Sequence, residues 1–290
     1  MRKLLLQLDS SRLPSVFDQV VAYDAGADVV MSYGGVTEGD VRDLIHGCIF
    51  TRGPKDLKDT AVFIGGADMR AGEQLLAAAR RAFFGPFTVS LMLDSNGSNT
   101  TAVAAVAKML DAAGDVRGKR AVVVAGTGPV GRRAAGLLAR AGAQVLITSR
   151  TAQVGEEAAR AVAQRFGGPV TSVEMRGPSE AAAVLEQAHL LLNTGPAGVQ
   201  LVPQRAWTGR RALLVAADCN AVPPFGIEGI DPMDNGVLKE GVTVFGALGL
   251  GGLKMKVHKA CIARLFERND LVLDAETIAD VAREWIARKS

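Results

Sequence analysis

The sequence predicts an α/β fold divided into two domains, each built on a parallel sheet covered by helices. The chain has 290 residues, which is more than a typical single domain. Short apolar runs of strand length alternate with helical patterns through most of the chain, as is typical of parallel sheets. The alternation falls into two series, the second of which begins near residue 119. Each series therefore predicts one domain.

The first series reads as strands separated by helices. Strands are expected at 3–9, 27–33, 60–66 and 87–93, and helices at 15–24, 38–47 and 69–84. Thr37 and Asp40 have the spacing of a capping box at the second helix, and Asp68 can cap the third. A helix of small residues over 96–113 is expected to connect the two series.

The second series has more strands and ends in an irregular stretch. Its strands are expected at 119–126, 143–149, 169–175, 189–195 and 211–218. The prolines and glycines of "CNAVPPFGIEGID" exclude a regular element directly after Asp218. The segment 242–245 is strand-like, and closing helices are expected at 252–267 and 275–288, the latter capped by Asp274.

Composition and charge argue against several classes of protein. The net charge is only +3, and no block of lysine and arginine stands beside aromatic residues, so no nucleic-acid partner is indicated. The three cysteines are far apart and show no metal-ligand spacing, so neither a disulfide framework nor a metal site is expected. Gln7 and Asp9 interrupt the apolar run at the N-terminus, and no apolar stretch is long enough to span a bilayer. We therefore expect a cytoplasmic protein with no membrane association.

A glycine motif opens the second series. Gly126, Gly128 and Gly131 form GxGxxG after an apolar strand and at the start of an amphipathic helix, with another strand following within about thirty residues. The first glycine permits the tight turn, the second lets the backbone approach a pyrophosphate, and the third lets helix and strand pack closely. Free N–H groups at the helix start favour phosphate. The motif predicts a dinucleotide site formed by Gly126, Thr127, Gly128, Pro129, Val130 and Gly131.

The end of the next strand indicates which dinucleotide binds. An NAD site usually carries Asp or Glu there, which accepts a hydrogen bond from the adenosine ribose. This chain has Ser149, Arg150 and Thr151 instead. A hydroxyl and a guanidinium suit a 2′-phosphate, which favours NADP, although Arg150 could also be a solvated residue at a strand end.

Ligands of open α/β sheets bind outside the carboxyl ends of the strands. Loops rich in Gly, Pro, Asn, Ser and Thr lie there at 94–101, 193–198 and 218–231. Within these loops Thr194, Gly195 and Asn220 are candidate cofactor-binding residues. No serine stands in a nucleophile elbow, and the three histidines offer no obvious catalytic triad. These features favour a pyridine-nucleotide enzyme that works without a metal.

The stretch "GALGLGGLKMKVHKA" (246–260) raises a separate question. Its glycines stand ahead of a predicted helix, in which Lys254 and His258 share one face. It is either a flexible turn followed by a solvated helix or a segment that approaches a ligand closely.

Several segments together resemble one enzyme family over nearly the whole chain. They are "PSVFD" (14–18), "FFGPF" (83–87), "LDSNGSNTT" (93–101), "AGTGPVG" (125–131), "PPFGIEGID" (223–231) and "FGALGLGGLKMKVHKACIARLFE" (245–267). In this order they resemble the NADP-dependent methylene-tetrahydromethanopterin dehydrogenases of one-carbon metabolism. The resemblance implies oxidation of methylene-tetrahydromethanopterin to the methenyl form, with methylene-tetrahydrofolate as an alternative substrate. It also implies a homotrimer.

The resemblance further implies a domain arrangement and a set of site residues. An N-terminal α/β substrate domain (1–104) is completed by helices returning over 252–290, and the Rossmann-type NADP-binding domain covers 105–251. The family's active-site residues match Phe17, Thr101, Lys254 and His258, with Thr100 as the neighbouring alternative for the threonine. Thr151 departs from relatives that have a basic residue there, which leaves NAD open as a cofactor.

Two rival functions remain open from the residues alone. One is a bifunctional methylene-tetrahydrofolate dehydrogenase and cyclohydrolase, in which a lysine assists attack of water on the methenyl product. The other is a non-catalytic NADP-binding sensor. Hydride loss from a carbon between two nitrogens leaves a cation that their lone pairs stabilise, so the preferred reaction requires no general base and depends mainly on positioning.

Overall fold

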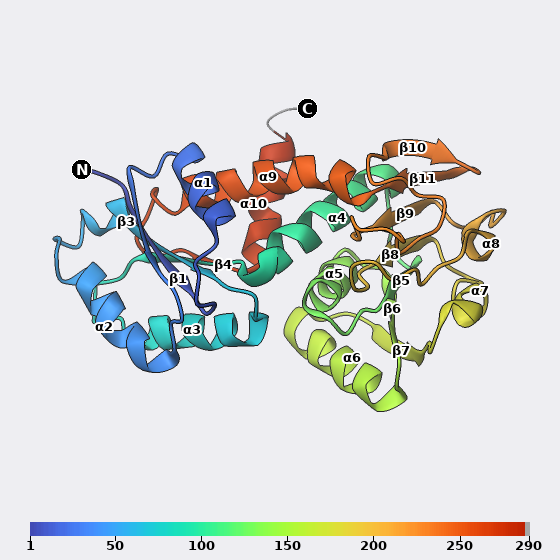
Figure 1. Ribbon diagram of the computed structural model, residues 1–290, viewed down its shortest axis with the longest axis horizontal. Coiled ribbons are helices and arrows are strands. Elements are labelled where there is room, and N and C mark those ends of the chain that lie inside the picture. The colour runs from blue at the N-terminus through green and yellow to red at the C-terminus, as the bar shows by residue number, and fades with distance from the viewer. Residues whose placement is uncertain (288–290) are drawn as a thin grey trace. The chain divides into compact units, whose positions relative to one another are not determined.

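A computed structural model describes residues 1–287 and divides the chain into two compact units (Figure 1). Unit 1 comprises Met1–Thr100 and the C-terminal segment that begins at Met255, and unit 2 comprises Thr101–Lys254. The α/β class and the parallel sheets expected from the sequence are confirmed. Position 288, the last residue of the final expected helix, lies outside the described residues.

Unit 1 is built on a parallel sheet with the strand order β12-β4-β3-β1-β2. Its strands are β1 (Leu4–Asp9), β2 (Val29–Tyr33), β3 (Thr60–Gly65), β4 (Ser90–Leu93) and β12 (Val272–Leu273). Its helices are α1 (Val16–Asp24), α2 (Glu38–Ile49), α3 (Met69–Arg81) and α10 (Ala275–Ala287). The four strands of the first series are thus confirmed, whereas β12 was not predicted because it has only two residues.

Helices α2 and α3 begin at the residues that the sequence predicts, and α1 begins one residue later than predicted. At α2, Asp40 Oδ2 accepts hydrogen bonds from Thr37 N (2.9 Å) and Oγ1 (2.7 Å). At α3, Asp68 Oδ1 accepts from the backbone of Arg70 (2.8 Å) and Ala71 (3.3 Å). These carboxylates satisfy N–H groups that have no partner within the helix.

Alternation along the strands of unit 1 divides its side chains between the two faces of the sheet. Leu6 and Leu8 of β1 pack with apolar residues of α2 and α3, such as Ile45 and Leu75, in one buried cluster. Gln7 of β1 points to the opposite face and is also buried. A polar side chain at that depth requires hydrogen bonds, and those bonds organise the site described below.

Unit 2 contains a seven-stranded sheet in the order β10-β11-β9-β8-β5-β6-β7. Its strands are β5 (Arg120–Val124), β6 (Gln144–Ser149), β7 (Val170–Glu174), β8 (Leu190–Asn193), β9 (Val215–Asp218), β10 (Asn235–Lys239) and β11 (Val242–Phe245). Its helices are α5 (Pro129–Arg140), α6 (Ala152–Phe166), α7 (Ala181–Val184) and α8 (Gln204–Trp207). All strands are parallel except β10, which pairs antiparallel with β11 and was not predicted. On one face, Trp207 and its neighbours form a buried cluster with Val122 and Ala216.

Two helices contain the boundaries between the units. They are α4 (Ser98–Ala113) and α9 (Ala247–Arg264). The start predicted for the second of these, residue 252, is wrong, because Gly249, Gly251 and Gly252 lie inside the helix rather than in a turn ahead of it. Glycine weakens a helix by about 1 kcal/mol relative to alanine, so these residues need a reason in the packing or in the function.

Candidate functional site

The glycine loop of unit 2 joins β5 to α5 as the sequence predicts. Gly128 is the N-cap residue of α5, and Pro129 occupies the first turn. Thr148 of β6 holds the loop from the side, since its hydroxyl accepts a hydrogen bond from Ala125 N (2.9 Å) and its carbonyl accepts one from Gly126 N (3.1 Å). The start of α5 therefore presents a fixed N-terminus, the geometry that favours bound phosphate.

The three glycines of the motif have different surroundings. A Cβ on Gly126 would lie 2.7 Å from Ile147 Cβ, and one on Gly131 would lie 2.6 Å from the Cα of Gly126. Neighbouring protein atoms therefore leave no room for a side chain at Gly126 or Gly131. A Cβ on Gly128 would meet only the carbonyl oxygen of Ala125, at 3.9 Å. The structure thus leaves space at Gly128, where the motif expects a pyrophosphate to approach the backbone.

Thr194 supports the same loop from the end of β8. Its hydroxyl donates to the carbonyls of Val124 (3.0 Å) and Ala125 (3.3 Å), and a Cβ on Gly131 would lie 2.7 Å from it. Gly195, the next residue, donates its N–H to Asn193 Oδ1 (3.2 Å). Both predicted residues lie at the carboxyl ends of the strands, beside the glycine loop.

Asp218, the last residue of β9, organises the neighbouring loop. Its Oδ1 accepts hydrogen bonds from Asn193 Nδ2 (2.7 Å) and Asn220 N (3.0 Å), and its Oδ2 accepts one from Ile227 N (2.8 Å). Burial raises the pKa of Asp218, and these hydrogen bonds oppose the shift. The carboxylate therefore holds both ends of the segment 219–227 close to the carboxyl end of β9.

Asn220 continues this network within the loop. Its Oδ1 accepts from Gly198 N (3.3 Å) and Val222 N (2.9 Å), and its Nδ2 donates to the carbonyl of Pro224 (3.1 Å). The side chain is buried. Asn220 therefore joins the loop after β8 to the loop after β9, both of which border the strand ends.

The expected adenosine end of the cofactor site lies at β6. Ser149 is buried, Arg150 is exposed, and Thr151 is the N-cap residue of α6. The neighbouring strand supplies a carboxylate that the sequence pattern did not indicate, because Glu174 is the register partner of Ser149. Its Oε2 accepts a hydrogen bond from Ala152 N (3.0 Å) at the start of α6.

In unit 1, buried polar groups hold the loop that leads to Phe17. Asp9 accepts hydrogen bonds from Ser11 N (2.7 Å) and Ser15 N (3.0 Å), and Gln7 Nε2 donates to the carbonyl of Ser15 (3.3 Å). The Ser15 hydroxyl then accepts from Asp18 N (3.2 Å) and caps α1. Phe17 is thereby fixed in the first turn of α1 at the carboxyl edge of the sheet, with its side chain half exposed.

His258 lies beneath Phe17 rather than at the surface. Its ring is fully buried and stacks on Phe63 of β3, with the centroids 5.5 Å apart and the planes at 23°. The Phe17 ring also contacts the imidazole, tilted by 43° at a centroid distance of 6.3 Å. The three rings form a column from the core to the exposed phenylalanine.

The two candidate threonines at the start of α4 differ in their surroundings. Thr100 is fully buried, and its hydroxyl donates to Asp94 Oδ2 (2.6 Å) while its N–H donates to Asp94 Oδ1 (3.0 Å). Thr101 is only half buried. The hydroxyl of Thr100 is therefore engaged in capping the helix, which favours Thr101 as the residue that faces a ligand.

On α9, Lys254 is half buried one turn before His258. Lys256 is exposed, and its ammonium lies 5.4 Å from the ring centroid of Trp285. The two lysines thus have different environments, as their spacing in a helix predicts.

The glycines at the start of α9 fall into two groups. A Cβ on Gly246 would lie 2.0 Å from the carbonyl oxygen of Asp231, and one on Gly249 would lie 1.9 Å from that of Asp234. These two are required because the helix start packs against the backbone of the preceding loop. Gly251 and Gly252 have nothing within 4 Å of their Cβ positions. Packing within the protein therefore explains why Gly246 and Gly249 are glycines, but it does not explain Gly251 and Gly252.

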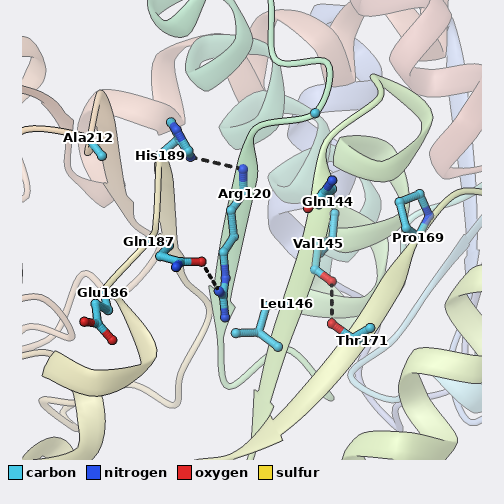
Figure 2. A pocket seen from close by; sticks show the side chains of 11 residues that line it. Arg120, Gln144, Val145, Leu146, Pro169, Thr171, Glu186, Gln187, His189 and Ala212 are labelled. Atoms are coloured by element: carbon cyan, nitrogen blue, oxygen red, sulfur yellow. Dashed lines mark hydrogen bonds between the residues drawn. The ribbon is translucent and has the colours of Figure 1, made fainter.

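A cavity of about 730 Å³ lies elsewhere, as Figure 2 shows. Arg120, Gln144 and Thr171, which stand at the amino ends of β5, β6 and β7, line it together with His189. Arg120 donates to Gln187 Oε1 (3.2 Å) through its guanidinium and to His189 Nδ1 (3.2 Å) through its backbone N–H. The cavity is at the amino ends of these strands, whereas the glycine loop is at their carboxyl ends. It is therefore not the expected cofactor site.

Comparison with known proteins identifies the family. Residues 16–96 match the family described as methylene-tetrahydromethanopterin dehydrogenase, N-terminal. The chain is 35% identical over 289 residues to an NAD(P)-dependent methylenetetrahydromethanopterin dehydrogenase of Methylorubrum extorquens, with 94% of this chain and 95% of the relative covered. A second relative in that organism, "Bifunctional protein MdtA", is 50% identical over 284 residues, covering 98% of this chain and 99% of the relative.

The chain belongs to the methylene-tetrahydromethanopterin dehydrogenase family. It is an oxidoreductase of one-carbon metabolism, as the sequence resemblance implied. Solved structures support the fold alone. Shikimate 5-dehydrogenase from Listeria monocytogenes matches with a TM-score of 0.57 at 10% identity, covering 98% of this chain and 96% of that one. Quinate dehydrogenase from Corynebacterium glutamicum matches with a TM-score of 0.55 at 13% identity, covering 98% and 99%.

Within this family member, sequence reasoning missed three supporting side chains. Thr148, Asn193 and Asp218 are polar residues at or near the carboxyl ends of apolar strands. A polar residue at the carboxyl end of an apolar strand can be recognised in the sequence. It indicates a supporting or binding role, because a buried polar side chain must hydrogen-bond to the protein or to a ligand. Among residues 1–287, no group of His, Cys, Asp and Glu side chains could hold a metal ion, and no helix is long and apolar enough to cross a membrane.

Proposed function

We propose that this dehydrogenase transfers a hydride from methylene-tetrahydromethanopterin to NADP and yields the methenyl form, with methylene-tetrahydrofolate as a second substrate. Membership of the family supports the reaction. The observation that carries cofactor binding is the open position at Gly128, between two glycines whose Cβ positions are closed by packing. A side chain at Gly128 would disturb little of the protein, so the glycine suits a ligand that needs close backbone approach.

We assign the cofactor to the strand ends of unit 2. Gly126, Thr127, Gly128, Pro129, Val130 and Gly131 hold its pyrophosphate. Thr194, Gly195 and Asn220 hold the nicotinamide side, and Ser149 and Arg150 hold the 2′-phosphate. NADP is favoured over NAD because the end of β6 carries Ser149 and Arg150 without a carboxylate, and because Glu174, the register partner of Ser149, accepts a hydrogen bond from the N-terminus of α6. When bound, NADP supplies the hydride acceptor, C4 of its nicotinamide ring.

The protein's own contribution to the reaction is mainly positioning. The methylene C–H bond breaks with both electrons leaving as hydride, and the lone pairs of the two flanking nitrogens delocalise the positive charge. No proton leaves that carbon, so no side chain acts as its base. Phe17 offers a ring face for the pterin, and Thr101 and Lys254 offer hydrogen-bond donors for its polar edge. His258 supports the Phe17 ring from below.

The proposal includes self-association into a homotrimer in the cytoplasm. An exposed apolar stripe on α1 supports association, and it consists of Val16, Phe17, Val20 and Tyr23. Each of these side chains is at least half exposed in the single chain. Apolar stripes of this kind commonly mark surfaces that bind other protein chains.

The test is reduction of each nucleotide with each methylene-pterin, followed by the absorbance of the reduced nicotinamide. We expect the highest kcat/KM for methylene-tetrahydromethanopterin with NADP. Hydrolysis of the methenyl product is measured in the same samples, because faster hydrolysis than in buffer would indicate a cyclohydrolase. Absence of nucleotide reduction with either pterin would refute the proposed function.

A further inference from the structure

We infer that Arg176 is a second cation for the adenosine 2′-phosphate and acts together with Arg150. The inference rests on the proposed use of NADP and deepens it. Arg176 follows β7, whereas the 2′-phosphate site expected from the sequence lies entirely at the end of β6. Its assignment comes from how the two strand ends are joined in the structure.

The backbone places Arg176 directly beside the end of β6. The register pairs Ser149 with Glu174, and Met175 N donates to the carbonyl of Ser149 (2.8 Å). Arg176 is the next residue. Its own N–H donates to Glu180 Oε2 (2.7 Å), which fixes the chain as it leaves the strand. The starting point of the Arg176 side chain is therefore set by hydrogen bonds on both sides.

Glu174 orients the guanidinium of Arg176. One carboxylate oxygen, Oε2, accepts from Ala152 N at the start of α6, and the other, Oε1, forms an ion pair with Arg176 Nε. The Arg176 side chain nevertheless remains 75% exposed. An arginine held through Nε can still offer its terminal NH₂ groups to a phosphate, which it binds in a forked, charge-assisted geometry.

The charges explain why this arrangement suits NADP. A carboxylate beside a 2′-phosphate would repel it, so the charge of Glu174 must be offset for NADP to bind here. The helix N-terminus and Arg176 together offset the charge of Glu174. The positive charge of Arg150 is then available for the phosphate, and Arg176 adds donors of its own.

The test measures binding of adenosine 2′,5′-bisphosphate and of AMP, which differ only by the 2′-phosphate, to the full chain. Arg176→Met removes the guanidinium and keeps an aliphatic side chain. Arg160→Met, at an exposed position within α6, is the matched control for loss of one positive charge. We expect Arg176→Met to weaken the bisphosphate at least fivefold, with AMP changed less than twofold and the control unchanged for both ligands.

The possible results separate the two proposals. If the wild-type protein binds both ligands equally, the proposed preference for NADP fails. If the wild type prefers the bisphosphate and Arg176→Met retains that preference, Arg176 does not bind the 2′-phosphate. An equal loss for both ligands would also overturn the inference, because it would place Arg176 against the adenine instead. Arg176→Lys keeps the positive charge but loses the forked guanidinium. Its affinity for the bisphosphate should therefore lie between those of the wild type and Arg176→Met.

Discussion

Lys254 is the residue whose substitution best distinguishes a ligand-binding α9 from a solvated one. It is half buried, whereas Lys256, two residues further along, is exposed. We expect Lys254→Met to lower kcat/KM for the methylene-pterin at least about tenfold, on the order of 1.4 kcal/mol, with little change in NADP affinity. Lys256→Met is the control and should be mild. Equal damage from both variants, or none from Lys254→Met, would favour a solvated helix.

Asp218 lends itself to a test of stability. An asparagine side chain has only one acceptor oxygen, so it could not accept all the hydrogen bonds that Asp218 accepts from Asn193, Asn220 and Ile227. Asp218→Asn should therefore lower the free energy of unfolding by about 1–3 kcal/mol near neutral pH. Asp43→Asn, at an exposed position on α2, is the control. Chemical denaturation curves measure both. A loss no larger than that of the control would show that the loop after β9 does not depend on this carboxylate.

The same residue predicts how stability varies with pH. Because burial raises the pKa of Asp218 above its ordinary value of 3.8, the unfolded chain releases this proton at lower pH than the native protein does. The contribution of Asp218 to the free energy of unfolding is therefore greatest below that value, and it declines as the pH rises toward the native pKa. The advantage of the wild type over Asp218→Asn should accordingly shrink as the pH rises above 3.8. A widening gap would contradict the raised pKa.

At the scale of elements, the β5–α5 loop permits a substitution that separates folding from binding. Gly128 has a φ of −75° and a ψ of 172°, which valine adopts readily, and its Cβ position is open. Gly128→Val should therefore fold normally and lose NADP binding. Gly131→Ala is the contrasting variant, since its Cβ would meet Gly126 and should destabilise the protein by about 1–3 kcal/mol. Thermal unfolding and a nucleotide titration give the two readouts, and normal NADP affinity in Gly128→Val would refute the assigned loop.

The middle of α9 offers a second test of this kind. Gly252→Ala should stabilise the protein by about 0.5–1 kcal/mol, because the site is helical and open. If the glycine serves close approach of the pterin, the same variant should raise KM for the pterin. Gly47→Ala in α2, where the Cβ position is also open, is the control for stability without an effect on KM. An unchanged KM in Gly252→Ala would remove the functional reason for that glycine.

Periodicity and capping residues predicted most elements of the fold, but tertiary contacts decided the rest. β12 and β10 were missed because one has two residues and the other is exposed, so neither has a clear apolar pattern. The start of α9 was placed too late because its glycines resemble a turn, although Gly246 and Gly249 allow the helix to pack on the 231–234 loop. For the site, the glycine loop could be predicted from spacing. Spacing along the chain does not specify which strands are neighbours in the sheet. It therefore could not predict the hydrogen bonds of Asp218 or the pairing of Glu174 with Ser149.

At the scale of the whole molecule, the exposed stripe on α1 predicts assembly. Val20 is 54% exposed in the single chain. If the stripe is a subunit interface, Val20→Glu should convert the oligomer to smaller species, because a carboxylate would lose its hydration there. Val154→Glu, at an exposed position on α6, is the control. Sedimentation velocity measures the masses, and an unchanged oligomer in Val20→Glu would place the interface elsewhere.

Unit 1 is built from two segments of the chain that are separated by the whole of unit 2, which affects the order in which its sheet can form. Ser90 and Leu91 of β4 bond to the backbone of 268–271, and β12 then pairs with β4, so this side of the first sheet is closed by residues translated after all of unit 2. All of unit 2 is translated before those residues. During that interval β4 is an unpaired edge in the nascent chain, the kind of surface on which strands of other molecules can add. The sheet of unit 1 therefore depends on residues 268–273, which are translated only after the whole of unit 2.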